Sequence, residues 1–317
     1  MPQARSARRS KSRDRGRLDA DERVRRAREA QEAAALVARQ AVERATVRRD
    51  AVWRQAAEQN RRRSLTVLGA PFLPGVVLAV LGVFALALLV VGLVLLAGWA
   101  VVAVAAFRRA HSGEGVRLTG VNPDEAVERG ALGALAAERL ADVTESLCAA
   151  LGLSPPELVV LVDPAPNAIS AGSGEASRLV VTTGLVSSLE RIELEAVLAH
   201  ELAHHKRADT LSGGLSAALL RGGQIPGTAR LASWLEGRDR ELSADLAAVQ
   251  VTRYPPGLVS ALEKARSATT RSPATAVAAP VLAETTSLWW VPLDEHAEGA
   301  REGAFGLDER LELLAEL

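Results

Sequence analysis

The distribution of hydrophobic and polar residues is dominated by one run of 43 residues, 65–107, that contains no charged side chain. A helix that crosses a membrane needs about 20 apolar residues, so this run fits two spans joined by a short turn near 82–86. Arginines flank the run at 61–63 and at 108–109. By the positive-inside rule both flanks face the cytoplasm, as a helical hairpin requires. A single long, tilted span with its flanks on opposite sides is the alternative.

The residues before this run are strongly basic. Positions 1–63 hold 19 Lys/Arg and 9 Asp/Glu, a formal charge of +10, in a chain whose 38 basic and 38 acidic residues balance overall. Residues 1–17 lack apolar periodicity and are expected to be disordered, whereas 18–63 contain no Gly or Pro and predict a juxtamembrane helix. This arm is expected to lie near anionic lipid or to self-associate. Because Trp53 is its only aromatic residue, nucleic-acid binding is not expected.

The chain after the apolar run has the pattern of a mainly α domain with a small β-sheet. Short apolar segments predict strands at 157–162 and 177–185, and longer amphipathic segments predict helices. The segment 268–306 is expected to be loop with short elements. The single cysteine, Cys148, excludes an internal disulfide framework. The helices are expected at 131–152, 190–207, 209–221, 229–251, 256–267 and 307–317.

The helix expected at 190–207 contains a candidate metal site. In "VLAHELAHHKRADT" (197–210), His200, Glu201 and His204 form the pattern H-E-x-x-H. Residues i and i+4 share one helix face, so both imidazoles can reach one metal ion while Glu201 points beside it. Such a site suits zinc, which would activate a water molecule for peptide-bond hydrolysis with Glu201 as general base. Glu241 is a candidate third ligand, and Asp245 can hydrogen-bond a ligand imidazole.

These segments resemble a known family. "NAISAGSGEASRLVVTTGLVSSLERIELEAVLAHELAHHKRADT" and the later "RELSAD" are similar to the membrane-associated zinc metallopeptidases of the HtpX-like and CAAX-prenyl-protease (gluzincin) family. The resemblance covers about 167–250. It implies a zincin-like α+β metallopeptidase domain, here 108–317, that binds one Zn²⁺ per chain through His200, His204 and Glu241.

The resemblance also implies supporting residues. Asp209 and Asp245 match the aspartates of the family's two motifs, and Asn167 with Ala168 would form the strand edge that an extended substrate joins. The family's His-Pro pair before a C-terminal arginine is missing, so His296 is a candidate for stabilising the oxyanion. His205 is turned about 100° from His204 on the helix and is expected to be exposed.

Pattern and resemblance together predict a membrane-anchored zinc endopeptidase. It is expected in the cell membrane with two spans (64–107), and with its N-terminus and catalytic domain in the cytoplasm. The expected partners are the lipid bilayer and a polypeptide substrate, either unfolded or a membrane protein, and the resemblance implies a role in membrane-protein quality control. Two alternatives remain open: a signalling protease of the antibiotic-receptor type, and a non-catalytic membrane adaptor with a structural zinc site.

Overall fold

Contacts in the computed structural model divide the chain into two units, 1–55 and 56–317. The expected disordered tail (1–17) and most of the expected basic helix (18–63) lie outside the described residues. The described part of that helix belongs to a helix with the bounds Asp50–Gly69. The structure describes residues 50–70, 72–81, 86–113, 120–221, 228–271, 288–292 and 305–317.

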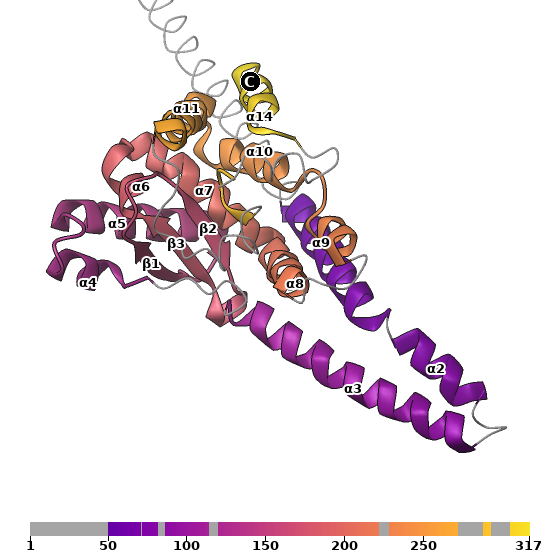
Figure 1. Ribbon diagram of the computed structural model, residues 1–317. Helices are drawn as coiled ribbons and strands as arrows, with labels where there is room; N and C mark the ends of the chain where they lie inside the picture. Colours follow the sequence, from indigo (N-terminus) through magenta and orange to yellow (C-terminus); the bar gives the residue numbers. More distant parts are fainter. Residues whose placement is uncertain are drawn as a thin grey trace, which may run out of the picture. The chain divides into compact units, whose positions relative to one another are not determined.

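The long apolar run begins in the helix Asp50–Gly69 and continues in two further helices, α2 (Phe72–Leu81) and α3 (Leu86–His111). The short α2 packs beside part of the longer α3 (Figure 1). Glycine permits this close packing, because a Cβ added to Gly92 would lie only 2.7 Å from the main-chain nitrogen of Ala79. The backbones of the two helices are therefore close to one another at this point.

Length and composition give one or two candidate membrane spans in the described part of the chain. Leu89–His111 is long and apolar enough by itself. Asp50–Gly69 and Phe72–Val80 qualify only together, as one span bent by 44°. Pro71 lies in the break between them, and proline interrupts the hydrogen-bond ladder of a helix. The expected pair of spans stays a prediction.

The domain after α3 is mainly helical with a small sheet, as the pattern predicted. One helix prediction was wrong, because the segment expected as a single helix at 229–251 forms two. Gly237 lies between them with a φ of +76°, a left-handed conformation that ends a helix. The helices are α4 (Pro123–Glu128), α5 (Ala134–Leu151), α6 (Thr183–Ser188), α7 (Arg191–Arg207), α8 (Asp209–Arg221), α9 (Thr228–Glu236), α10 (Arg240–Thr252), α11 (Pro255–Arg271) and α14 (Leu307–Ala315).

The sheet has three strands in the order β1-β3-β2. The central strand β3 (Arg178–Thr182) pairs in parallel with β1 (Glu157–Leu161) and antiparallel with β2 (Ala168–Ala171). The sequence did not predict β2. The strand expected at 177–185 ends earlier, because the side chain of Thr182 accepts a backbone N–H of α6 and caps that helix.

Helix α7 is the centre of the domain. Helices α5, α10 and α11 pack against it, and β2 covers another side (Figure 1). Ser170 of β2 donates a hydrogen bond of 2.9 Å to the main-chain oxygen of Glu201. At the start of α7 the Glu193 side chain accepts the N–H of Glu190, which forms a capping box. The H-E-x-x-H residues therefore lie on a buried helix that is fixed at its N-terminus and along its sides.

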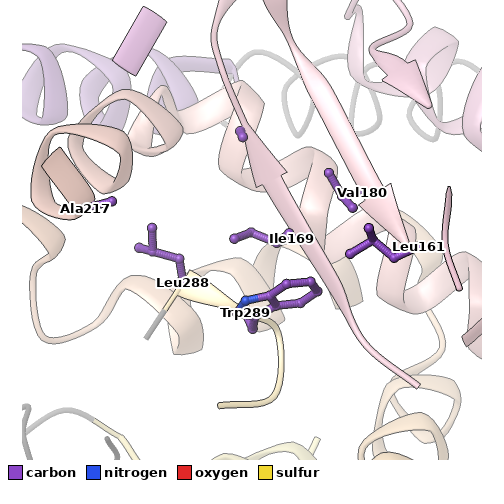
Figure 2. Close-up of a cluster of buried hydrophobic side chains, with 7 residues drawn as sticks. Leu161, Ile169, Val180, Ala217, Leu288 and Trp289 are labelled. Carbon is purple, nitrogen blue, oxygen red and sulfur yellow. The ribbon is translucent and has the colours of Figure 1, made fainter. Parts of the chain in front are cut away.

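The opposite face of the sheet carries a separate hydrophobic cluster. Ile169 and Ser170 are consecutive residues of β2, so their side chains lie on opposite faces of the sheet. Because Ser170 contacts α7, the side chain of Ile169 points away from it. It packs with Val180 of β3, and the segment 288–292 contributes Trp289, which is 1% exposed (Figure 2). This cluster holds a segment from the C-terminal part of the chain against β2. Its buried members are Leu161, Ile169, Ala171, Val180, Ala217, Leu288 and Trp289.

Candidate metal centre

Two imidazoles converge beside α7. His200 and His204 are one helical turn apart, and their Nε2 atoms are separated by 3.2 Å. The rings meet edge to face at 83°. Neither side chain is more than 1% exposed. With Glu201 they form a group whose possible ligand atoms all lie within 4.8 Å of one another, which is suitable for binding a metal ion.

Helix α10 brings a carboxylate to the same point. It packs against α7 and has Glu241 in its first turn. One carboxylate oxygen of Glu241 lies 3.3 Å from Nε2 of His200, and the other lies 3.9 Å from Nε2 of His204. The structure thus brings together the three side chains that the sequence suggested as ligands.

Each imidazole is oriented by an aspartate at its other nitrogen. His200 Nδ1 lies 2.7 Å from Asp245, and His204 Nδ1 lies 2.8 Å from Asp209. Burial disfavours the charged form of both aspartates. Nearby Arg310 and His200 nevertheless lower the pKa of Asp245, and His204 lowers the pKa of Asp209. An ionised carboxylate can only accept, so each Nδ1 donates. In the neutral rings the two Nε2 atoms therefore present lone pairs to one another.

The site attracts positive charge. Burial opposes protonation of His200, but Asp245 and Glu241 outweigh it and raise the pKa of His200 to about 9. Burial likewise disfavours the Glu241 carboxylate, but Arg240 and the two histidines hold the pKa of Glu241 well below its usual value. A proton and a metal cation would compete for the same Nε2 lone pair.

The buried charges around the site also fit a divalent cation. Four buried carboxylates and two buried guanidinium groups surround it, and the less buried Arg207 lies 3.2 Å from Asp209, so negative charge predominates when both imidazoles are neutral. Uncompensated buried charge is costly, and a divalent cation would balance it. Two imidazoles and a carboxylate are also a common ligand set for catalytic zinc. The six buried charged residues are Glu201, Asp209, Arg240, Glu241, Asp245 and Arg310.

Arg310 is a part of the site to which sequence reasoning gave no role. From α14 it donates to both carboxylate oxygens of Asp245, at 2.6 and 2.9 Å, and to the main-chain oxygen of Trp290 at 3.0 Å. It is 1% exposed. The only signal in the sequence was the arginine-containing helix of the resembled family. The bidentate pair ties the C-terminal helix to the partner of His200.

Arg240 was also missed, although it directly precedes Glu241 in the sequence. Its guanidinium donates to the Glu241 carboxylate, and its Nε lies 3.8 Å from Asp209. It therefore lies between a proposed ligand and the aspartate that orients His204. Its buried position could not be read from the sequence, where arginine most often indicates a solvated surface.

The turn between α7 and α8 places the Asp209 side chain beside His204. Ala208 adopts a left-handed conformation with a φ of +56°, which is uncommon for a residue other than glycine. This conformation costs about 1–2 kcal/mol, so surrounding contacts must hold it. Asp209 supplies them through His204 and through Arg207, whose Nε lies 3.2 Å from the carboxylate.

Glu201 is buried beside the imidazoles with its carboxylate unpaired. It is 1% exposed, and neither carboxylate oxygen has a hydrogen-bond partner among the described residues. Buried polar groups in proteins are nearly always hydrogen-bonded, so an exception calls for a functional explanation. The explanation consistent with this position is a group that exchanges protons with a bound molecule.

The expected substrate edge is paired with the chain itself at Asn167 and Ala168. The Asn167 side chain donates to the Val291 carbonyl at 2.7 Å and accepts the Val291 N–H at 3.1 Å. The Trp290 N–H donates to the Ala168 carbonyl at 3.0 Å. This part of the edge of β2 is therefore occupied by the segment 288–292.

The remaining histidine predictions have different outcomes. His205 is half-buried, not exposed, because its Nε2 donates to the Arg178 carbonyl at 3.1 Å. Burial lowers the pKa of His205 to about 4. It lines a cavity of about 350 Å³, together with Leu202 and Glu175, that includes none of the proposed metal ligands. His296 lies outside the described residues.

The H-E-x-x-H helix, with a glutamate from a second helix beside it, defines a site of the metalloprotease class. Comparison with known proteins points in the same direction. Residues 134–225 match the sequence model of peptidase family M48. The match includes His200, Glu201 and His204, whereas Glu241 lies beyond it. No solved structure matches the chain.

Relatives of known name are proteases of the HtpX type. A "Protease HtpX homolog" of Dictyoglomus thermophilum is 34% identical over 160 residues, which cover 39% of this chain and 53% of the relative. One from Listeria monocytogenes is 30% identical over 170 residues, covering 39% and 56%. One from Limosilactobacillus reuteri is 29% identical over 172 residues, covering 42% and 58%. The chain thus spans a little over half the length of these relatives, and the resemblance seen in the sequence is confirmed.

Proposed function

We propose that this chain is a zinc-dependent endopeptidase. The observation that carries the proposal is the convergence of His200, His204 and Glu241 beside the buried, unpaired carboxylate of Glu201. Three protein ligands with an adjacent base match a catalytic zinc site, which keeps one coordination position open for water or substrate. A structural site would be closed by a fourth protein ligand.

The proposed roles follow from what each side chain contacts. His200, His204 and Glu241 would hold the zinc, which supplies Lewis-acid polarisation of the scissile carbonyl and a lowered pKa of water. Glu201 would accept a proton from the attacking water and pass it to the leaving amine nitrogen. Asp245 would hold the ring of His200 in the required tautomer.

Asp209 would orient His204 in the same way. Its carboxylate lies 2.8 Å from Nδ1 of His204, and Arg240 and Arg207 lie on its other side. An additional donor, for which His296 is the candidate, would stabilise the oxyanion of the tetrahedral intermediate.

An extended polypeptide would bind by adding a strand to the edge of β2. The Asn167 side chain and the Ala168 carbonyl already make hydrogen bonds to the main chain of the segment 288–292, at Val291 and Trp290. If a substrate pairs at these two residues, it must therefore replace those bonds with its own. An unfolded or partly extracted membrane protein is the proposed substrate, because an unfolded segment can readily adopt the extended conformation that strand addition needs.

The chain is proposed to be anchored in the cell membrane by two spans, with its N-terminus and catalytic domain in the cytoplasm. The packing supports a hairpin over one long span. Val67, at the entry of the apolar run, and Ala110, just after its end, belong to the same buried cluster. Two flanks that pack together must lie on the same side of the membrane, and Arg108 and Arg109 favour the cytoplasmic side.

The test is cleavage of an unfolded polypeptide by the detergent-solubilised chain. Glu201→Gln keeps the size of the side chain but removes the base, and we expect kcat to fall by about 10²–10⁴-fold. Zinc content should stay at one per chain, because Glu201 is not among the proposed ligands. Removal of zinc with a chelator should abolish cleavage, and readdition should restore it.

Glu195→Gln is the matched control, since it makes the same change on a partly exposed carboxylate of the same helix. It should leave kcat unchanged. Cleavage that persists in Glu201→Gln, or after removal of zinc, would end the proposal. Zinc binding without cleavage of any unfolded polypeptide would instead support the non-catalytic adaptor.

A further inference from the structure

Helix α9 exposes two large apolar side chains. Leu231 and Trp234 are 37% and 47% exposed and lie one helical turn apart. The residues after each of them, Ala232 and Leu235, are buried against the domain. The helix is therefore amphipathic, but its outward face combines apolar side chains with the exposed Arg230.

The packing of α9 locates this face relative to the apolar helices. Leu235 shares a buried cluster with Val67 and Ala110. Ala110 lies three residues after the last residue of the apolar run, Phe107, and Val67 lies two residues after its first, Leu65. At a rise of 1.5 Å per residue, these distances along the helices are only about 3–5 Å.

The interfacial layer of a bilayer is about 5–8 Å thick on each side of its hydrocarbon core. If the apolar run marks the hydrocarbon core, α9 therefore lies at the depth of the lipid headgroups. The exposed Arg108 and Arg109 lie at this level too, on the last turn of α3. Helix α8 packs against both α9 and the last turn of α3. At the contact with α3, a Cβ added to Gly214 of α8 would lie 3.0 Å from Ala110.

We propose that α9 is an interfacial helix whose outward face, formed by Arg230, Leu231 and Trp234, contacts the lipid headgroup layer. The inference rests on the membrane anchoring given under Proposed function. Tryptophan is enriched at this depth because its ring is apolar while its N–H can hydrogen-bond. Arginine beside it suits anionic phosphate. The occupant of this surface is thus a lipid bilayer.

A second protein copy fits the surface less well. Two exposed apolar side chains next to an arginine form a small patch, whereas a stable protein interface buries about 800 Å² on each partner.

The lipid contact also has a consequence for the metal centre. Helix α9 ends at Glu236, and α10 begins at Arg240, one residue before Glu241. Contact of α9 with lipid would therefore fix the height of the metal centre above the membrane.

The experiment places a fluorescent label at single positions of the full chain. Trp234→Cys is labelled with an environment-sensitive fluorophore and reconstituted into vesicles of phosphatidylcholine and phosphatidylglycerol. Tyr254→Cys is the matched control, since Tyr254 is an aromatic residue of similar exposure, 50%, at the start of α11. Cys148 is buried and should not react in the folded chain. Both variants should unfold at the same temperature as the unaltered chain in detergent.

We expect lipid-attached quenchers to quench the label at 234 and aqueous iodide to leave it largely unquenched, with the reverse at 254. A label at 234 that iodide quenches as strongly as the label at 254 would overturn the proposal. Protection from iodide without quenching by lipid would also overturn it and would point to a protein partner. A chain that does not float with the vesicles would contradict the membrane anchor itself. The readout needs no peptidase activity, so failure of the catalytic proposal would be seen separately.

Discussion

At the scale of single residues, the metal centre depends on side chains that orient other side chains. Asp245 accepts a hydrogen bond from Nδ1 of His200 and two more from nitrogens of Arg310. Its position determines which ring nitrogen of His200 is free to bind a metal. A change at Asp245 or Arg310 should therefore alter metal affinity although neither residue is a proposed ligand.

We expect Asp245→Asn to weaken zinc binding by about 10–100-fold, because the amide cannot replace the charged acceptor of the His200 ring. The same change removes the closest carboxylate partner of the buried Arg310 and leaves Glu241, 3.9 Å away, as its remaining ion pair, so it should lower the free energy of unfolding by about 1–3 kcal/mol. Competition with a zinc-binding dye measures the affinity, and urea unfolding measures the stability.

Two further variants separate these effects. The double variant Asp245→Asn with Arg310→Met also removes the guanidinium group that has lost its closest partner. It should therefore recover stability without recovering zinc affinity. Asp308→Asn also removes a carboxylate from an arginine pair, with Arg266, but this pair is exposed and includes no residue of the metal centre. It should change neither quantity. Equal zinc affinity in Asp245→Asn and the unaltered chain would contradict the orienting role.

His205 gives a prediction for pH dependence. Burial lowers the pKa of His205 to about 4, below the value near 6.5 of an unfolded chain. Between these values the unfolded chain binds more protons, so the stability that neutral His205 provides is present above about pH 6.5 and is lost as pH falls through about 4. Relative to His205→Gln, the unaltered chain should lose up to about 3 kcal/mol of unfolding free energy over this range.

Urea unfolding of the unaltered chain and of His205→Gln at a series of pH values checks this prediction. A chelator is present throughout, so that release of zinc contributes to neither unfolding curve. A difference between the two chains that does not vary with pH would contradict the prediction, because it would show that folding leaves the pKa of His205 unchanged. The hydrogen bond from its Nε2 to the Arg178 carbonyl should keep the ring in place in the neutral form.

The site could be predicted from the sequence where helix periodicity determines geometry. His200 and His204 are four residues apart on a long helix, so their convergence needs no knowledge of the tertiary structure. Glu241 could be proposed only through its spacing to Asp245 and the resemblance. Arg310 could not be assigned, because its contact with Asp245 depends on how the C-terminal helix packs, and a buried arginine resembles a surface one in sequence.

At the scale of elements, the passage from β3 into α6 requires glycine. A Cβ added to Gly184 would lie 2.1 Å from the Pro164 carbonyl oxygen and 2.4 Å from its carbon. These are backbone atoms that cannot rotate away. The N–H of Gly184 also donates to the Asp163 carbonyl at 2.8 Å, which keeps the two segments close. This close approach accounts physically for the glycine at position 184, one residue after Thr183.

We expect Gly184→Ala to lower the free energy of unfolding by at least about 1–3 kcal/mol, because the backbone next to Pro164 must move. Gly133→Ala is the control: Gly133 has a φ of −73° and no atom within 4 Å of an added Cβ. Because Gly133 is the N-cap of α5, where alanine is less favourable than glycine, the effect of this control should stay within about 1 kcal/mol. Chemical unfolding compares the two, and equal stabilities would contradict the close approach at Gly184.

Elements with a strong local pattern were predicted well, and those made by tertiary contacts were not. The helix expected at 190–207 matches α7 almost to the residue. In contrast, β2 is a strand only because it pairs with β3, and its four residues show no alternation of polar and apolar side chains. The break at Gly237 was missed because a single glycine within a helical pattern is often tolerated.

At the scale of the whole molecule, charge and hydrophobicity are separated along the sequence. Residues 1–63 carry a formal charge of +10 and the remainder carries −10, with the uncharged run beginning just after the basic part. Anionic lipid on the cytoplasmic side would attract the basic part and repel the rest. The acidic catalytic domain would then be held at the membrane by α2 and α3 rather than by its net charge.

The hairpin predicts that both ends of the chain lie in the cytoplasm. In the proposed hairpin Val67 and Ala110, which pack in one cluster, would place both flanks of the apolar run on the same side of a bilayer. In bacterial expression, green fluorescent protein should fluoresce at either terminus, and alkaline phosphatase, active only outside the cytoplasm, should be inactive at both. Phosphatase inserted in the expected turn at 82–86 should be active. Phosphatase activity at one terminus only would instead indicate a single span.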